Sequence, residues 1–312
     1  MLPFRGLLAY PVTPLGPDGA PDLGVLSRLV LDAARAGVDG VAVLASSGAG
    51  VTFDAAERDA VVRAAVEAAA SAGPRDSADR ASDRVPVHAA VSGASTREVV
   101  ARARAAQRAG ADGLVLAPFS YVPLVDAEVV ALFGAVADAV DLPVCFYNKP
   151  VQTGYDLSPE VFARLVHDTT VVAVKDPAVL PTRDHDRVDA LRAAGPGVSV
   201  GLSGDVPLLD DAPPADAWHT GIAALAPVEY LAVRRERADG TPTPEGEASR
   251  RWLLEVARAT AAMRPVSALH ALANALGVPT APPRGPSLPV TAAEKATLRD
   301  LVARRPALPV VR

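Results

Sequence analysis

Short runs of β-branched and other apolar residues recur along this chain and alternate with longer, alanine-rich stretches of helical composition. This alternation is typical of βαβ units, in which helices join parallel strands. Eight such runs can be counted, which favours a closed (β/α)8 TIM barrel over a doubly wound open sheet. We predict strands over Gly6–Val12, Val38–Leu44, Val85–Val91, Gly113–Ala117, Leu142–Tyr147, Val171–Lys175, Val198–Leu202 and Trp218–Ala224.

The chain continues well beyond the eighth predicted strand. We expect the barrel to occupy residues 1–226, and a C-terminal helical extension packed on the barrel to occupy residues 227–312. Within the extension, the patterns of Arg250–Leu276 and Thr291–Ala303 predict helices. The intervening segment 279–289 is rich in proline and is predicted to be an irregular connector.

Local signals indicate where helices begin and where loops lie. Capping-box spacing, in which Ser, Thr or Asp is followed three residues later by Glu, predicts helix starts after Asp54, Ser95 and Thr291. Residues 75–84 are charged and lack apolar periodicity, and Ala238–Ser249 is rich in Pro, Gly and Glu. We expect both segments to be surface loops.

Composition argues against several classes of protein. The formal net charge of −5 disfavours a broad nucleic-acid-binding surface. No apolar run reaches the roughly 18 residues of a membrane helix, and Met1–Arg5 lacks the pattern of a signal peptide. Cys145 is the single cysteine, so no intramolecular disulfide can form. These features predict a cytoplasmic protein without membrane or nucleic-acid partners.

Lysine is rare in this chain, with three lysines against 28 arginines. One of them, Lys175, ends the sixth predicted strand, where period-two alternation puts it on the same face as Val171 and Ala173. If that face lines the barrel, the amine points into the C-terminal mouth, where barrel active sites lie. A buried, neutral amine there is suited to Schiff-base formation. The alternative is a solvated lysine at a strand end.

Tyr147 ends the fifth predicted strand and is followed by Asn148. Because the C-terminal ends of barrel strands share one mouth, this phenol is predicted to reach the same cavity as Lys175 and to transfer protons there. The alternative is an aromatic side chain packed at the barrel rim, with its hydroxyl bonded locally.

Two loops after predicted strands offer hydroxyl and backbone N–H groups. Ser46, Ser47 and Gly48 follow the second strand, and Ser203 and Gly204 follow the seventh. Such groups can hold a small carboxylate. Either segment also fits an ordinary Ser/Gly loop, so these two motifs are weak on their own.

The sequence gives no sign of a metal or nucleotide site. His88 and His219 show no metal-ligand spacing with the other histidines. No glycine-rich segment has the spacing of a P-loop or of a dinucleotide-binding loop. We therefore predict that the protein binds no metal.

Taken in order, these segments resemble the dihydrodipicolinate synthase/N-acetylneuraminate lyase family from end to end. The tyrosine and lysine motifs are fairly specific at their separation, and the others support them by their order. The segments that carry the resemblance are Gly6–Pro14, Ala45–Gly48, Val91–Thr96, Tyr147–Pro150 with Thr153–Gly154, Val174–Asp176, Ser203–Asp205 and Leu276–Arg284.

The resemblance implies a (β/α)8 barrel with a C-terminal helical extension, assembled as a homo-oligomer, either a tetramer or a dimer. It implies that pyruvate or a similar 2-keto acid binds as an imine on Lys175, with Tyr147 as the acid/base group. The loop of Ser46 and Ser47 would hold the carboxylate of the keto acid. No metal or organic cofactor would take part.

Departures from the family pattern bear on the substrate. Gln152 stands where lysine-pathway synthases carry an arginine that grips the carboxylate of the second substrate, and a neutral amide cannot replace that cation. Ser120 replaces a tyrosine of the family's proton relay, so either Tyr121 has taken over that role or the relay differs. His219 stands where small apolar residues are usual, and is either a substrate contact or a packed histidine.

The favoured function is a class I lyase or aldolase that acts through a lysine Schiff base on pyruvate or a 2-keto-3-deoxy acid, by aldol cleavage, addition or dehydration. One alternative is the 4-hydroxy-tetrahydrodipicolinate synthase reaction, which Gln152 disfavours. Another is a catalytically degraded barrel that binds a keto acid as a sensor or partner subunit. The presence of both Lys175 and Tyr147 argues against this last alternative.

Overall fold

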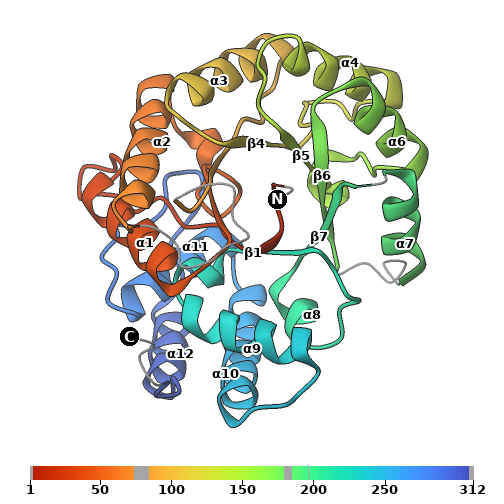
Figure 1. Ribbon diagram of the computed structural model, residues 1–312. Helices are drawn as coiled ribbons and strands as arrows, with labels where there is room; N and C mark the ends of the chain where they lie inside the picture. The colour runs from red at the N-terminus through yellow and green to blue at the C-terminus, as the bar shows by residue number, and fades with distance from the viewer. Residues whose placement is uncertain (1–2, 74–83, 179–184, 196, 309–312) are drawn as a thin grey trace.

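The computed structural model describes residues 3–73, 84–178, 185–195 and 197–308. Eight parallel strands follow one another around a closed barrel, and β8 pairs with β1 to complete it. Figure 1 looks down this barrel and shows the helices arranged around it. The predicted (β/α)8 barrel is confirmed, and the open sheet is excluded. The strands are β1 (Gly6–Ala9), β2 (Gly40–Val43), β3 (Val87–Ala90), β4 (Gly113–Leu116), β5 (Val144–Tyr147), β6 (Val171–Pro177), β7 (Ser199–Ser203) and β8 (Ala217–Thr220).

Most strands are shorter than predicted, because the ladder of hydrogen bonds stops where the chain leaves the barrel wall. The strand β6 is longer than predicted, since it continues through Asp176 and Pro177. The eighth predicted strand, Trp218–Ala224, is wrong beyond Thr220, because Ile222–Ala224 form a short 3-10 helix, η2. All three residues of η2 are buried, and a buried apolar run has the same sequence pattern in a helix as in a strand.

Helices connect the strands and begin at side-chain caps. The predicted capping boxes at Asp54 and Thr291 are confirmed. Ser95 also caps its helix, but the carboxylate of Glu98 accepts a hydrogen bond from the backbone N–H of Ala94 rather than of Ser95. The elements between the strands are α1 (Leu23–Ala36), η1 (Gly50–Thr52), α2 (Ala55–Ala70), α3 (Thr96–Arg108), α4 (Asp126–Ala137), α5 (Pro150–Thr153), α6 (Pro159–Asp168), α7 (His185–Ala194) and α8 (Asp205–Leu209).

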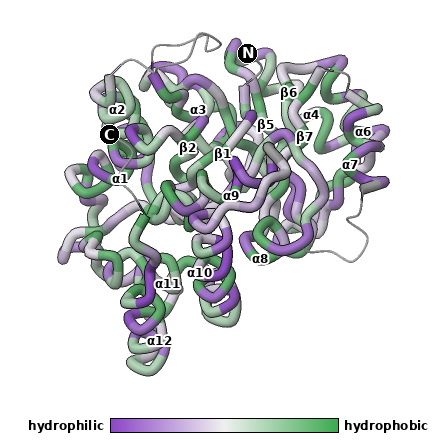
Figure 2. Tube along the Cα trace, turned by 60° about the horizontal axis from the view of Figure 1, so that its bottom comes forward, coloured by the Kyte–Doolittle hydropathy of each residue, from purple (hydrophilic) through white to green (hydrophobic). Residues whose placement is uncertain are grey.

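Among the described residues, four α-helices follow β8 and η2, and Figures 1 and 2 show three of them, α10 to α12, gathered on one side of the barrel. The loop predicted over Ala238–Ser249 is confirmed only between the two helices, because α9 continues to Asp239 and Pro244 begins α10, which Thr243 caps. The helix predicted over Arg250–Leu276 is divided in two, because Pro265 begins a new helix. The four helices are α9 (Pro227–Asp239), α10 (Pro244–Ala261), α11 (Pro265–Ala275) and α12 (Ala292–Ala303).

The division of the chain at residues 226 and 227 stays a prediction. The helix α9 contacts β1 and α1 of the barrel and also packs against α10, so it joins the two parts. The other loop expected from the sequence, at residues 75–84, lies almost entirely outside the described residues.

Glycines on the inner face of the barrel leave room for two buried histidines. A Cβ on Gly201 would lie 2.1 Å from Nε2 of His219, and a Cβ on Gly113 would lie 2.8 Å from Nδ1 of His88. The His88 ring stacks on Phe4, with ring centroids 4.0 Å apart. The interior is therefore a packed core with imidazoles in it, and His219 is the histidine nearer the ends of the strands, because it pairs in register with the last residue of β7.

Candidate active site

Lys175 lies on the inner face of β6, near the end of the strand, and its side chain is only 5% exposed. It pairs in register with Tyr147, the last residue of β5. Its Nζ atom lies 4.0 Å from the centroid of the Tyr147 ring and 3.8 Å from that of Tyr10, which follows β1. The amine is therefore buried between two aromatic faces at the mouth of the barrel.

Burial is the main influence on the charge of this amine. It lowers the pKa of Lys175 from the usual 10.5 to about 7, while Cys145 and Asp205 act in the opposite direction. In a large fraction of the molecules, the Lys175 amine is consequently neutral near neutral pH. A neutral amine is the form that attacks a carbonyl, so Lys175 has the state that Schiff-base formation requires.

The rate of imine formation should follow this ionisation. Raising the pH through about 7 removes the proton from Lys175, so the rate with pyruvate should rise about tenfold per pH unit below 7 and level off above it. The measurement is rapid mixing with pyruvate at each pH, quenching with borohydride and weighing the adduct. A rate that keeps rising toward the usual lysine pKa of 10.5 would contradict the effect of burial.

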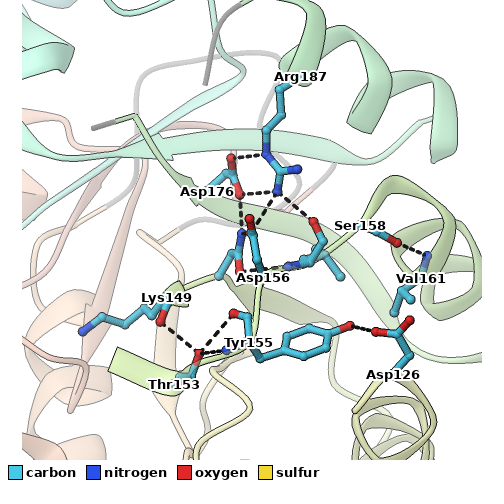
Figure 3. A network of polar contacts seen from close by, with 11 residues as sticks. Asp126, Lys149, Thr153, Tyr155, Asp156, Ser158, Val161, Asp176 and Arg187 are labelled. Atoms are coloured by element: carbon cyan, nitrogen blue, oxygen red, sulfur yellow. Dashed lines mark hydrogen bonds and ion pairs between the residues drawn. The ribbon is translucent and has the colours of Figure 1, made fainter. Parts of the chain in front are cut away.

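A network of hydrogen bonds holds Lys175 and Tyr147 in place through the residues that follow them in the chain, Asp176 and Asn148. Nδ2 of Asn148 donates hydrogen bonds to Asp176 (2.7 Å) and Asp156 (2.8 Å). The guanidinium of Arg187 on α7 binds both carboxylate oxygens of Asp176, at 2.9 and 3.0 Å (Figure 3). Because these bonds join the ends of β5 and β6, they fix the distance between the amine and the phenol.

Tyr147 meets the requirement for a proton-transfer group at this site. Its ring is half-buried against Lys175, and its hydroxyl forms no hydrogen bond with any residue that the structure describes. The hydroxyl is therefore available to a substrate held on the amine. The position agrees with the sequence-based prediction, and the acid/base role itself stays a prediction.

The loop after β2 carries one buried and one exposed serine hydroxyl. The Oγ atom of Ser47 is buried and has no partner within the described part of the chain. Ser46 is exposed, and its Oγ accepts a hydrogen bond of 2.8 Å from Nζ of Lys149. Two non-glycine residues with left-handed backbone bracket the loop, Leu44 (φ 63°) and Ala49 (φ 49°). Such strain persists only where the surrounding structure holds it.

Gly48 joins this loop to the segment that follows β1. It is buried, and its carbonyl accepts a hydrogen bond of 2.9 Å from Thr13. A Cβ on Gly48 would lie 3.1 Å from the Thr13 hydroxyl, so a larger residue would push the loop away. On the other side of the loop, a Cβ on Gly221 would lie 3.2 Å from Ser47, which places Ser47 at the end of β8.

His219 pairs with Tyr10, a residue that the sequence analysis did not single out. The Tyr10 hydroxyl and Nδ1 of His219 share a hydrogen bond of 2.8 Å. Burial raises the pKa of Tyr10 and lowers the pKa of His219 well below its usual 6.5, so both are neutral at neutral pH. The period-two pattern of the first strand could have found Tyr10, since it shares a face with Leu8.

The segment after β7 contributes the carboxylate of Asp205, a half-buried residue. Ser203 donates a hydrogen bond of 3.3 Å to the backbone carbonyl of Asp176, and Gly204 (φ 109°) turns the chain into α8. The Oδ1 atom of Asp205 accepts hydrogen bonds from the hydroxyls of Thr220 and Tyr230. Burial raises the pKa of Asp205, while the charge of Lys175 acts to lower it. Asp205 is therefore electrostatically coupled to the amine, a role that its motif alone did not indicate.

Three predicted site residues are not brought into this cluster. Tyr121 is 98% exposed, so within one chain its side chain does not pack beside Tyr147. Ser120 forms no hydrogen bond with a site residue among those described, and the Gln152 side chain is exposed on α5. The transfer of a relay role to Tyr121 therefore has no support within a single chain.

Within the described ranges, no group of three or more His, Cys, Asp or Glu side chains is placed to hold a metal ion. In the same part of the chain, no helix has both the length and the apolar composition needed to cross a membrane.

The candidate site consists of an amine, phenols, hydroxyls, an imidazole and a carboxylate, all supplied by the ends of strands and the loops after them.

The sequence profile of the Dihydrodipicolinate synthetase family matches residues 3–305. The chain belongs to this family. A curated relative, 4-hydroxy-tetrahydrodipicolinate synthase of Xanthomonas axonopodis pv. citri (strain 306), is 35% identical over 225 residues, which are 72% of this chain and 68% of the relative. The match of the profile to nearly the whole chain confirms the resemblance found in the sequence.

Two further members of the dihydrodipicolinate synthetase family extend the comparison. The putative 2-dehydro-3-deoxy-D-gluconate aldolase YagE of Escherichia coli (strain K12) is 35% identical over 174 residues, 55% of this chain and 54% of YagE. The crystal structure of YagE in complex with pyruvate has a TM-score of 0.82 at 26% identity, covering 97% of this chain and 98% of YagE. Dihydrodipicolinate synthase of Agrobacterium tumefaciens str. C58 has a TM-score of 0.83 at 30% identity, covering 97% and 98%.

The predicted enzyme class is confirmed at the level of the family. The relatives are named as synthases and as an aldolase, which are lyases that make or break bonds at a carbon skeleton. Membership agrees with the geometry, because the motifs that carry the resemblance are those that bring Lys175, Tyr147 and the Ser46–Gly48 loop to one mouth of the barrel.

Proposed function

We propose that this protein is a class I lyase or aldolase that forms a Schiff base between Lys175 and pyruvate or a 2-keto-3-deoxy acid. The observation that carries the proposal is a single buried lysine, with a pKa near 7, enclosed by the rings of Tyr10 and Tyr147 at the mouth of the barrel. The crystallised complex of the relative YagE with pyruvate supports a keto acid of this kind as the ligand.

Each step of the reaction can be given to a group in the site. The neutral amine of Lys175 attacks the C2 carbonyl, and the resulting carbinolamine loses water to give a protonated imine. In the cleavage direction, a proton leaves the C4 hydroxyl, the electrons of the C3–C4 bond move toward the imine nitrogen, and an aldehyde departs. The enamine then takes a proton at C3, and water releases pyruvate. Tyr147 lies where it can carry these protons.

The carboxylate of the keto acid is proposed to bind at the loop of Ser46, Ser47 and Gly48. The Oγ atom of Ser47 supports this, because it is buried with no partner among the described residues, and such a hydroxyl costs free energy until a ligand accepts its hydrogen bond. Ser203, Gly204 and His219 border the same mouth from β7 and β8 and are proposed as further substrate contacts.

Reductive trapping tests the proposal. The protein is incubated with pyruvate and borohydride, and its mass is measured before and after digestion. We expect one reduced pyruvate adduct per chain, on the peptide that contains Lys175. Absence of an adduct would contradict the proposal and would favour the catalytically degraded, keto-acid-binding barrel.

The 4-hydroxy-tetrahydrodipicolinate synthase reaction is a second candidate, because relatives with that name match the chain. Gln152 disfavours it, and we expect condensation of pyruvate with aspartate semialdehyde to be slow. Loss of a charge-assisted hydrogen bond costs about 1.5–3 kcal/mol, or roughly ten- to a hundredfold in rate. Efficient condensation by the purified protein would contradict this expectation.

Gln152→Arg provides a direct test of that position. If substrate selection acts there, the variant should improve any trace of synthase activity and impair the native reaction, as measured with both aldehydes side by side. If neither rate changes, Gln152 does not contact the substrate, in keeping with its exposed side chain.

We further propose that the protein is a cytoplasmic homo-oligomer, a tetramer or a dimer. Large apolar side chains are exposed on the segment after β4 and on α5, which lie close together because a Cβ on Gly154 would be 2.7 Å from Pro123. Such a patch is favourable as an interface between copies. Its exposed members are Phe119, Tyr121, Val122, Val125 and Val151.

A further inference from the structure

We propose that Lys149, together with Ser46, forms an anion-binding subsite at the mouth of the barrel, which receives a second acidic group of the substrate. The substrate class is then a dicarboxylic 2-keto acid, held as an imine on Lys175 through its carbonyl and on Lys149 through its distal carboxylate. This inference rests on the proposed imine at Lys175 and adds a specificity-determining residue to it. Lys149 is one of the three lysines of the chain, and its place in the sequence alone indicates no role.

Lys149 and Lys175 face the same tyrosine. Nζ of Lys149 lies 5.2 Å from the centroid of the Tyr147 ring, and Nζ of Lys175 lies 4.0 Å from it. The two Nζ atoms therefore cannot be further apart than the sum of these two distances. A short carbon chain beyond the imine carbon is enough to bring a carboxylate from one to the other.

Hydrogen bonds hold Lys149 in position both at its backbone and at its amine. Its backbone carbonyl accepts a hydrogen bond of 2.9 Å from the Thr153 hydroxyl, and its Nζ donates one of 2.8 Å to Oγ of Ser46. Figure 3 shows the side chain extended away from the Asp156–Asp176–Arg187 network. An ammonium carries three N–H donors, so the bond to Ser46 leaves donors for a ligand.

No carboxylate among the described residues neutralises the Lys149 cation. Within the part of the chain that the structure describes, Lys149 forms no ion pair, and three carboxylates of the site and its surroundings have other partners. Asp176 is bound by Arg187. The Asp126 carboxylate accepts a hydrogen bond of 2.9 Å from Tyr155, and Asp205 accepts from two hydroxyls. A half-buried cation with spare donors and no counter-ion is a favourable site for an anionic group of a ligand.

The two serines of the loop are suited to different carboxylates of the proposed substrate. Ser47, whose buried Oγ has no partner among the described residues, suits the carboxylate next to the keto group. Ser46 is exposed and already bonded to Lys149, so this pair suits a group further out. The neutral, exposed Gln152 is then not needed to bind the second carboxylate.

The test compares two keto acids of equal length, 2-oxoglutarate and 2-oxovalerate, which differ in whether a carboxylate stands at the far end. Each is trapped on the protein with borohydride over a range of concentrations, and the half-saturating concentrations are compared as a ratio within each variant. The ratio cancels any general change in imine formation. We expect the wild-type protein to favour 2-oxoglutarate by about tenfold or more, the scale of one charge-assisted hydrogen bond.

Lys149→Met should bring this ratio close to one, and Lys149→Arg should keep most of the preference because it keeps the charge. Lys295→Met is the matched control, since it removes an exposed lysine on α12 and should leave the ratio at the wild-type value. A wild-type protein that traps both acids equally, or a Lys149→Met variant that keeps the preference, would overturn the subsite. Failure of the wild-type protein to trap pyruvate at all would instead overturn the proposed imine.

Discussion

Lys175→Arg should abolish the trapping of pyruvate by borohydride and reduce turnover to background. Arginine has a similar length, but its guanidinium stays protonated and cannot form an imine. The effect should be the largest of any single substitution, because no other group described at the mouth of the barrel offers a buried amine with a lowered pKa. The measurement is the mass of the protein after treatment with pyruvate and borohydride.

A second variant keeps this result interpretable. Arginine brings a permanent charge into a pocket where the lysine is 5% exposed, which costs stability. Lys175→Met has a similar volume without the charge, and burial already disfavours the charged lysine, so this variant should fold at least as well at neutral pH. Both variants should lose the adduct. Persistent trapping on Lys149 or Lys295 would show that the imine has been assigned to the wrong residue.

Much of the barrel could be predicted from local pattern. Eight apolar runs separated by helical stretches gave the correct number and order of strands, because each βα unit carries its own signal within a few turns of chain. Period-two alternation also gave the direction of Lys175, since Val171 and Ala173 below it had to face the core. These predictions needed no knowledge of which strands meet.

The parts that failed or were missed depend on contacts between distant segments. The hydrogen bond of Tyr10 with His219 joins residues 209 apart, and that of Lys149 with Ser46 joins residues 103 apart. Neither pair has a spacing that a sequence displays. The structure shows the unusual His219 as the partner of Tyr10, with its other ring nitrogen unpartnered among the described residues, and its role as a substrate contact stays a prediction.

The position of the relay tyrosine could not be decided from the sequence. Replacement of the family's tyrosine by Ser120 left two hypotheses, a shift of the role to Tyr121 or a different relay. Tyr121 is 98% exposed in one chain, whereas Lys149 occupies the space beside Tyr147 and Ser46. The proposed relay role of Tyr121 therefore has no support within one chain, and the cation beside Tyr147 is Lys149.

Tyr147→Phe should reduce turnover about a hundredfold or more, the usual scale for losing a general acid/base. The ring remains, so its contacts with Lys175 and Lys149 are kept, and only the hydroxyl is lost. That hydroxyl forms no hydrogen bond with the described residues, so its removal leaves no buried partner unsatisfied and the fold should be unaffected. The steady-state rate and the unfolding temperature measure the two effects separately.

The same variant also separates binding from proton transfer. Imine formation needs protons to move as water leaves, so the pyruvate adduct on Lys175 should form more slowly in Tyr147→Phe but reach the same final amount. Tyr121→Phe serves as the comparison, because it removes a hydroxyl from an exposed ring outside the cluster. If Tyr147→Phe turned over at the wild-type rate while Tyr121→Phe was slow, the proton-transfer role would belong to Tyr121. Because Tyr121 is exposed in a single chain, that role would require contact with a neighbouring copy, and the active site would then be completed only in the oligomer.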